Sequence, residues 1–364
     1  MSEWPDTRIL DLFGIEIPII QAPMAGATTP EMVLAVSEAG GLGALPSAQY
    51  NTEQLRAALD TIRAGTKKPI NVNFFAHTMP QADPARQMAW RARLASYYVE
   101  AGLDPADPIP SGGRAPFDMS FCDVVEAYKP EIVSFHFGLP AAALLDRVRA
   151  TGAKIISSAT TVAEAQWLAE RGVDAIIAMG FEAGGHRGNF LTENMATQVG
   201  TMALVPQIVD AVNVPVIAAG GIADGRGVAA AFALGASAVQ VGTAYLFATE
   251  AKIPAVHRAA LMRAGDDNTA LTNVFTGRPA RGVINRVMRE VGPISDLAPA
   301  FPTAGGALAP LRAKAEAAGG DDFTNLWSGQ AAKLARPMSS AEFTHVLAAD
   351  GLRIMRRLAG GKSD

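Results

Sequence analysis

The sequence predicts an α/β protein and, within that class, a closed (β/α)8 barrel, also called a TIM barrel. Short apolar runs that end in small residues recur along the chain, and most are followed by an Ala- and Leu-rich stretch with helical spacing. Strands that are apolar throughout bury both faces, which is typical of a parallel sheet covered by helices. Eight such runs in succession favour a closed barrel, although an open doubly wound sheet with extra strands would give the same pattern.

The strands and helices are expected in strict alternation. Stretches such as PEMVLAVSEAGG and TEQLRAALDTIRAG carry apolar residues at helical spacing and end at glycine, where a left-handed C-cap is favoured. The expected strands lie within 17–26, 41–47, 69–75, 131–138, 153–159, 173–180, 214–221 and 237–246.

Two segments interrupt this alternation. Residues 76–130 form an insertion after the third strand, with an expected helix over 85–101 and a loop rich in Pro and Gly. Residues 251–364 follow the eighth strand and contain several short helical patterns. We therefore expect a barrel over 8–250 that carries the insertion, and a helical C-terminal region packed on it as a small second domain or lid.

Composition excludes several classes of function. The chain has 364 residues, with 31 Lys and Arg against 35 Asp and Glu. The sequence contains no stripe of basic residues interleaved with aromatic ones, so nucleic acid is a poor partner. The single cysteine, Cys122, excludes an intrachain disulfide, and the five histidines show no spacing typical of a metal site. No apolar run approaches the length of about 20 residues that spans a membrane. We expect a soluble, cytoplasmic protein without a metal, and leave monomer and homodimer open.

Glycine-rich loops follow the last strands of the expected barrel. In this fold the active site lies at the C-terminal ends of the strands, and many barrels bind phosphate after strands seven and eight. Here AAGGIADGRG (218–227) and QVGTAYL (240–246) occupy those places. Glycines let main-chain N–H groups approach an anion, although they also make tight turns. Together with the glycines after strand six they indicate a phosphorylated cofactor such as FMN, whereas no GxGxxG follows the first strand as a dinucleotide fold requires.

The loop after strand six reads GFEAGGHRG and contains His186. A histidine titrates near neutral pH, so it can take a proton from a carbon acid above a bound ligand; a purely structural role is the alternative. His77 and His136 also follow strands, and we expect them to form the pocket wall or hydrogen bonds. Asn73 either pairs with loop backbone or binds a ligand's polar edge, and Met24 lies either against a flat ring or in the core.

Eight motifs occur in order along the chain: QAPMAG, NVNFF, VSFHFGLP, GFEAGGHRG, AAGGIADGRG, QVGTAYL, TGRPARG and LWSGQAAKLAR. They resemble those of the FMN-dependent nitronate monooxygenases, formerly called 2-nitropropane dioxygenases. The resemblance runs from about residue 8 to residue 357 and is greatest to the class I group. It implies a TIM barrel with one non-covalent FMN that oxidises alkyl nitronates with O₂ to carbonyl compounds and nitrite, and propionate 3-nitronate as the natural substrate.

The resemblance also implies roles for single residues. His186 matches the family's base for neutral nitroalkanes, and the backbone around Met24 is expected against the flavin. Met179 stands where the family often has glutamine, which removes one polar contact to FMN. Phe301 stands where the family commonly has a tyrosine near the substrate pocket. We expect His136 to line the same pocket. The implied FMN contacts are Asn73, Gly184, Gly221, Gln240, Val241, Gly242 and Thr243.

Two other functions fit the same pattern. Flavin barrels that react with NAD(P)H, of the enoyl-acyl-carrier-protein reductase or quinone reductase type, also carry a GGH loop. A barrel that binds a phosphorylated ligand without turnover is the second alternative. Covalent acyl chemistry has little support, because the sequence contains no GxSxG motif.

Overall fold

The computed structural model describes residues 3–110 and 113–360, and its centre is a sheet of eight parallel strands. The order of the strands is β1-β9-β8-β6-β5-β4-β3-β2. The two ends of the sheet meet, because Gln21 N–H donates to Leu42 O (3.0 Å) and Leu42 N–H donates to Ile19 O (3.0 Å). The predicted (β/α)8 barrel is therefore confirmed, and the open sheet is wrong.

Each expected strand is present within its predicted range. The barrel strands are β1 (Ile19–Gln21), β2 (Gly43–Pro46), β3 (Ile70–Phe75), β4 (Ile132–His136), β5 (Lys154–Ala159), β6 (Ala175–Met179), β8 (Val216–Ala219) and β9 (Ala238–Val241). The helices are α1 (Arg8–Phe13), α2 (Pro30–Glu38), α3 (Thr52–Gly65), α4 (Pro84–Glu100), α5 (Met119–Tyr128), α6 (Ala142–Ala150), α7 (Val162–Glu170), α8 (Thr201–Ala211), α9 (Gly225–Ala233), α10 (Ala255–Arg263), α11 (Arg286–Val291), α12 (Ala309–Ala317) and α13 (Ser340–Leu358).

Local sequence explains where the barrel helices begin. At the start of α3, the Asn51 side chain accepts from Gln54 N–H (2.8 Å) and the Gln54 side chain accepts from Asn51 N–H (3.0 Å), which forms a capping box. The apolar face of the helix then packs into the layer between helices and sheet. A second apolar cluster, which includes Ile20, Ile156 and Ile217, fills the inside of the barrel.

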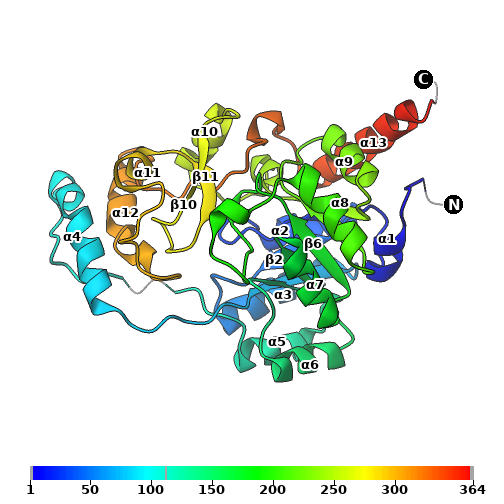
Figure 1. The fold of residues 1–364 in the computed structure, drawn as a ribbon, viewed down its shortest axis with the longest axis horizontal. Coiled ribbons are helices and arrows are strands. Elements are labelled where there is room, and N and C mark those ends of the chain that lie inside the picture. Colours follow the sequence, from blue (N-terminus) through cyan, green and yellow to red (C-terminus); the bar gives the residue numbers. More distant parts are fainter. Residues whose placement is uncertain (1–2, 111–112, 361–364) are drawn as a thin grey trace.

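The eighth barrel helix comes from the end of the chain. α13 packs against α9 and α2, the helices that follow the seventh and first barrel strands. Figure 1 shows α13 and α9 side by side. The segment between β9 and α13 therefore leaves the barrel and returns to it, so the C-terminal region contributes to the barrel as well as covering it.

The insertion and the C-terminal region share a hydrophobic core of their own. Trp90, on α4, is fully buried and its Nε1–H donates to Ala304 O (3.0 Å). Tyr98 O–H, from the same helix, donates to Ala307 O (2.6 Å). Figure 1 shows α4, α11 and α12 together, to one side of the barrel. α5, in contrast, packs against α3 and α6 and so covers the barrel.

A second sheet, absent from the sequence-based expectation, joins these two parts. β7 (Gly185–His186) pairs antiparallel with β11 (Ala280–Val283), which pairs with β10 (Thr269–Thr272). Residues 251–364 are therefore not purely helical. The pairing holds the loop after β6 against a segment almost a hundred residues later in the chain, because His186 lies opposite Ala280.

None of the described helices is both long enough and apolar enough to cross a membrane.

Candidate active site

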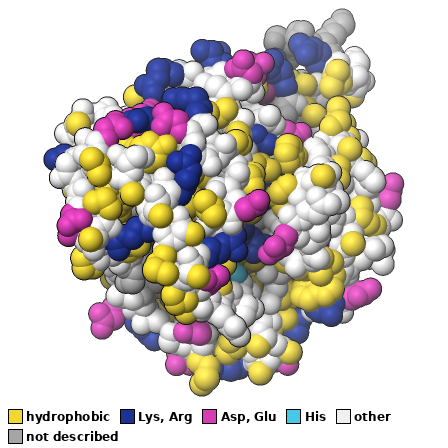
Figure 2. All heavy atoms as spheres, turned by 60° about the vertical axis from the view of Figure 1, so that its left-hand side comes forward, with side chains coloured by type: hydrophobic (Ala, Val, Ile, Leu, Met, Phe, Trp, Pro, Cys, Tyr) yellow, Lys and Arg dark blue, Asp and Glu magenta, His cyan; other side chains and the backbone are white. Residues whose placement is uncertain are grey.

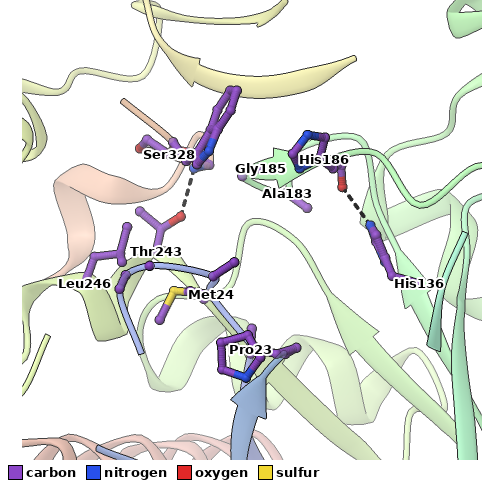
Figure 3. Close-up of a pocket in the computed structure, with 18 of the residues that line it drawn as sticks. Pro23, Met24, His136, Ala183, Gly185, His186, Thr243, Leu246 and Ser328 are labelled. Atoms are coloured by element: carbon purple, nitrogen blue, oxygen red, sulfur yellow. Dashed lines mark hydrogen bonds between the residues drawn. The ribbon is translucent and has the colours of Figure 1, made fainter. Parts of the chain in front are cut away.

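A cavity of about 500 Å³ lies at the C-terminal ends of the barrel strands. Its size falls in the range of about 300–1,000 Å³ that is typical of ligand sites. Figure 3 shows Pro23 and Met24 on one side of this space, Thr243 and Leu246 beside them, and His186 across from them. Ten residues expected from the sequence line the cavity: Met24, Asn73, His136, Met179, Gly184, His186, Gly221, Gln240, Gly242 and Thr243.

His186 is half-buried, and its ring is fixed by aromatic and polar neighbours. The ring centroid lies 5.3 Å from that of Phe301 and 5.5 Å from that of Trp327. Nε2 lies 3.0 Å from Thr276 Oγ1, which in turn lies 3.2 Å from Arg278 O. The carbonyl can only accept, so the threonine proton goes to it and His186 Nε2–H donates to the threonine. This network leaves Nδ1 as the basic nitrogen.

The surroundings of His186 keep its imidazole neutral. Burial lowers its pKa well below the usual 6.5, and the nearby charges of Arg114 and Arg278 and the rings of His136 and His77 act in the same direction. At neutral pH the ring is therefore unprotonated and able to accept a proton.

His136 positions the backbone of His186. Its Nε2 lies 3.1 Å from His186 O, the contact drawn in Figure 3, so Nε2 carries the proton and donates it. Nδ1 then accepts from Ser158 O–H (2.7 Å). Burial, more than any other cause, lowers the pKa of His136 to about 4, which keeps this arrangement intact at neutral pH.

Arg187 fastens the loop after β6 to the barrel. Its side chain is fully buried and donates to Gly180 O (2.5 Å), Met179 O (2.9 Å) and Gln198 Oε1 (2.9 Å). Burial lowers its pKa to about 10, so it remains a cation at pH 7. The strand end and the loop that carries His186 are thereby held at a fixed separation.

Three glycines present main-chain donors at the cavity. Within the described chain, the N–H groups of Gly184, Gly220 and Gly221 donate no hydrogen bond to the protein. A Cβ on Gly184 would lie 2.4 Å from Gly329 N, so only glycine fits there. Gly221 has φ of +72°, a conformation that favours glycine. This arrangement of unpaired N–H groups at the ends of β6 and β8 suits an anion such as a phosphate.

Polar side chains complete the opposite part of the cavity. Gln240 Oε1 is buried and has no hydrogen-bond partner among the described residues, so it is free to bind a ligand donor. Asn73 Nδ2–H donates to Ser134 Oγ (2.9 Å), a side chain on the neighbouring strand, rather than to loop backbone. Met24 lines the cavity and also packs against the hydrophobic core.

Three expected site residues do not line the cavity: Val241, Phe301 and His77. Neither ring nitrogen of His77 has a side-chain hydrogen-bond partner among the described residues. Val241 is 1% exposed and packs in the layer between strands and helices, although its carbonyl accepts from Ala22 N–H (2.8 Å). Phe301 lies behind His186, with its ring centroid 4.8 Å from that of His77 and 5.4 Å from that of Phe137. Alternation along β9 explains the first case, because successive side chains point to opposite faces.

The C-terminal region supplies cavity residues that had not been expected. Trp327, Ser328 and Gly329 line the cavity, and Gly329 N–H donates to Thr243 Oγ1 (2.8 Å). His257 also lines it and lies 2.9 Å, through Nε2, from Trp327 O. The motif LWSGQ was noted only through a family resemblance. Among the described residues, no group of His, Cys, Asp and Glu is arranged to hold a metal ion.

The family model and the most similar sequences point to the same family. Residues 6–350 match the family model described as nitronate monooxygenase. The nitronate monooxygenase of Pseudomonas aeruginosa is 41% identical over 93% of this chain and 97% of its own length. That of Paraburkholderia phytofirmans is 42% identical, with 92% of each chain covered. The crystal structure of nitroalkane oxidase from Streptomyces ansochromogenes matches with a TM-score of 0.87 and 36% identity, over 96% of this chain and 99% of that one.

Proposed function

The chain belongs to the nitronate monooxygenase family, and from this premise we propose that it oxidises alkyl nitronates with O₂ to a carbonyl compound and nitrite, using FMN. Propionate 3-nitronate is the substrate we propose for it. For neutral nitroalkanes, His186 acts as the base. The observation that carries this proposal is a half-buried imidazole, kept neutral by its surroundings, that lines a cavity with unpaired main-chain donors among the described residues.

The cavity residues fit FMN. The free N–H groups of Gly184, Gly220 and Gly221 suit its phosphate, and the unpaired Gln240 Oε1 suits a ring N–H. Met24 and the loop around it offer an apolar surface for the flat ring system. When bound, FMN supplies an acceptor for one electron from the nitronate, which is already a carbanion equivalent.

The protein's own groups prepare the substrate. His186 Nδ1 takes the α-proton of a neutral nitroalkane, while Nε2–H continues to donate its hydrogen bond to Thr276 Oγ1. The resulting imidazolium lies beside the nitronate anion and stabilises it. Phe75, Phe301 and Trp327 surround the ring and limit the access of water. A nitronate substrate skips the proton transfer altogether.

The purified holoenzyme tests the proposal directly. We expect the absorbance spectrum of a flavin that is bleached by propionate 3-nitronate without O₂, and nitrite release when O₂ is admitted. Bleaching by NADH but not by the nitronate would favour a reductase instead. A colourless protein that does not bind FMN would support a barrel without this chemistry.

The substitution His186→Asn tests the role of the base. The asparagine retains a polar group of similar size but cannot accept a proton, so we expect nitroalkane turnover to fall by about 10²- to 10⁴-fold. Nitronate turnover and FMN content should stay close to those of the unsubstituted enzyme. Unchanged nitroalkane oxidation in this variant would contradict the assignment.

A further inference from the structure

A second cavity, of about 400 Å³, adjoins the active-site cavity on the side of the insertion. The two cavities share Gln49, Arg114, Arg312 and Asn325 as lining residues. The far walls of this side cavity come from the loop before α12 and from Pro110 of the insertion. Figure 2 brings the side of α4 and α12 forward and shows a histidine side chain at depth, close to Lys and Arg side chains.

Arg114 lies at the junction of the two cavities without a counter-charge. Its Nε is buried and has no hydrogen-bond partner, and it forms no ion pair with any described residue. Burial and, after it, the charge of Arg312 lower its pKa to about 10, so the guanidinium stays charged at neutral pH. Burying an unpaired charge is costly unless an anion compensates it.

Arg312 adds a second cation to the same place. Its Nη1 donates to Asn325 Oδ1 (3.2 Å), which leaves other donors of the guanidinium free. It lies in the first turn of α12, a helix end with no side-chain cap. The carboxylate one turn later, Glu316, accepts from Thr324 O–H (2.8 Å) and makes no ion pair with either arginine within the described chain.

The position of this pair relative to His186 indicates what it binds. Arg114 and His186 line the same cavity, and after burial the charge of Arg114 is the next cause of the lowered pKa of His186. A ligand held at His186 can therefore extend toward the arginines. Guanidinium groups bind carboxylates through paired hydrogen bonds, which gives both affinity and orientation.

We propose that Arg114 and Arg312 form an anion subsite for the carboxylate of a dianionic nitronate whose nitronate carbon lies at His186. This inference rests on the proposed function and assigns its specificity to two named side chains. A nitronate with an uncharged tail would occupy the same reaction position but leave the subsite without its ligand. The two arginines would then discriminate between nitronates through KM, and they would leave the rate of the chemical step unchanged.

The test compares propionate 3-nitronate with propyl 1-nitronate, which has the same chain length and no carboxylate. In Arg114→Gln holoenzyme we expect kcat/KM for the carboxylate substrate to fall by about 10- to 100-fold, mainly through KM. For propyl 1-nitronate it should change by less than about 3-fold. Arg312→Gln should act in the same direction, and Arg114→Lys should retain part of the preference. Arg353→Gln, which changes an exposed side chain on α13, is the matched control.

Calorimetric titration with 3-nitropropionate and with 1-nitropropane provides a readout independent of turnover. Binding of the first should weaken in Arg114→Gln, and binding of the second should not. Equal losses for both substrates, or no loss for either, would overturn the subsite. If the unsubstituted enzyme turned over neither nitronate, the proposed function itself would fail, which is a distinct result. A thermal midpoint equal to that of the control variant establishes that Arg114→Gln is folded.

Discussion

The close contact at Gly184 makes a quantitative prediction about cofactor binding. In Gly184→Ala, the new Cβ would lie 2.4 Å from Gly329 N and 2.6 Å from Ser328 C. Both neighbours are backbone atoms, so the segment around Gly329 has to move. Overpacking of this kind costs about 1 to 3 kcal/mol.

The movement also breaks a hydrogen bond of the cavity wall. Gly329 N–H donates to Thr243 Oγ1 at 2.8 Å, and its loss adds about 1 kcal/mol. The combined cost, about 2 to 4 kcal/mol, destabilises the conformation in which Gly184 and Thr243 make their proposed contacts to FMN. We expect FMN to bind about 30- to 1,000-fold more weakly, since about 1.4 kcal/mol corresponds to a factor of ten.

The assay is a fluorescence titration of the FMN-free protein, with thermal unfolding measured in parallel. Gly320→Ala is the matched control, because a Cβ there would meet Ala315 O at an ordinary 3.4 Å. We expect the control to retain the FMN affinity and thermal midpoint of the unsubstituted protein. If Gly184→Ala bound FMN as tightly as the control, the proposed position of the cofactor would be wrong.

Two further predictions concern the base. The pKa of His186 is lowered well below 6.5, so the ring is neutral above that pH. We therefore expect kcat/KM for a neutral nitroalkane to be constant from about pH 6.5 upward and to fall only in acid. A decrease in kcat/KM governed by a pKa above 7 would contradict this. Thr276→Val removes the acceptor of the His186 Nε2–H, so nitroalkane turnover should fall about 10-fold while nitronate turnover is retained. Thr276→Ser should restore the rate, and a failure to do so would show that the hydroxyl is not the group responsible.

The barrel could be predicted from the sequence because its signal is local. Each strand is a short apolar run, and each following helix repeats its apolar residues at a spacing that a single window reveals. His186 was expected at the cavity because it lies in the loop after strand six, and active sites of this fold lie at the C-terminal ends of the strands. Met179 and Gln240, at the ends of β6 and β9, were expected there only through the family resemblance.

The remaining parts of the site depend on pairings that no local pattern encodes. His186 lies opposite Ala280 only because two segments from distant parts of the chain form a ladder, and Thr276 reaches the imidazole through that same arrangement. Arg114 lies in a loop of the insertion whose sequence reads only as rich in Pro and Gly. Its role depends on the absence of a partner for its side chain among the described residues, which the residue type alone does not indicate.

The charges around His186 favour an anionic substrate over a neutral one. Burial first, and then the cations of Arg114 and Arg278, lower the pKa of the imidazole, which makes it a weaker base toward a neutral nitroalkane. The same positive charges attract a nitronate and stabilise its negative charge in the cavity. A site selected for deprotonation would instead place a carboxylate behind the ring, as a hydrogen-bond acceptor that raises its pKa. Here Thr276, a neutral group, occupies that place, so the electrostatics are matched to a substrate that arrives already deprotonated.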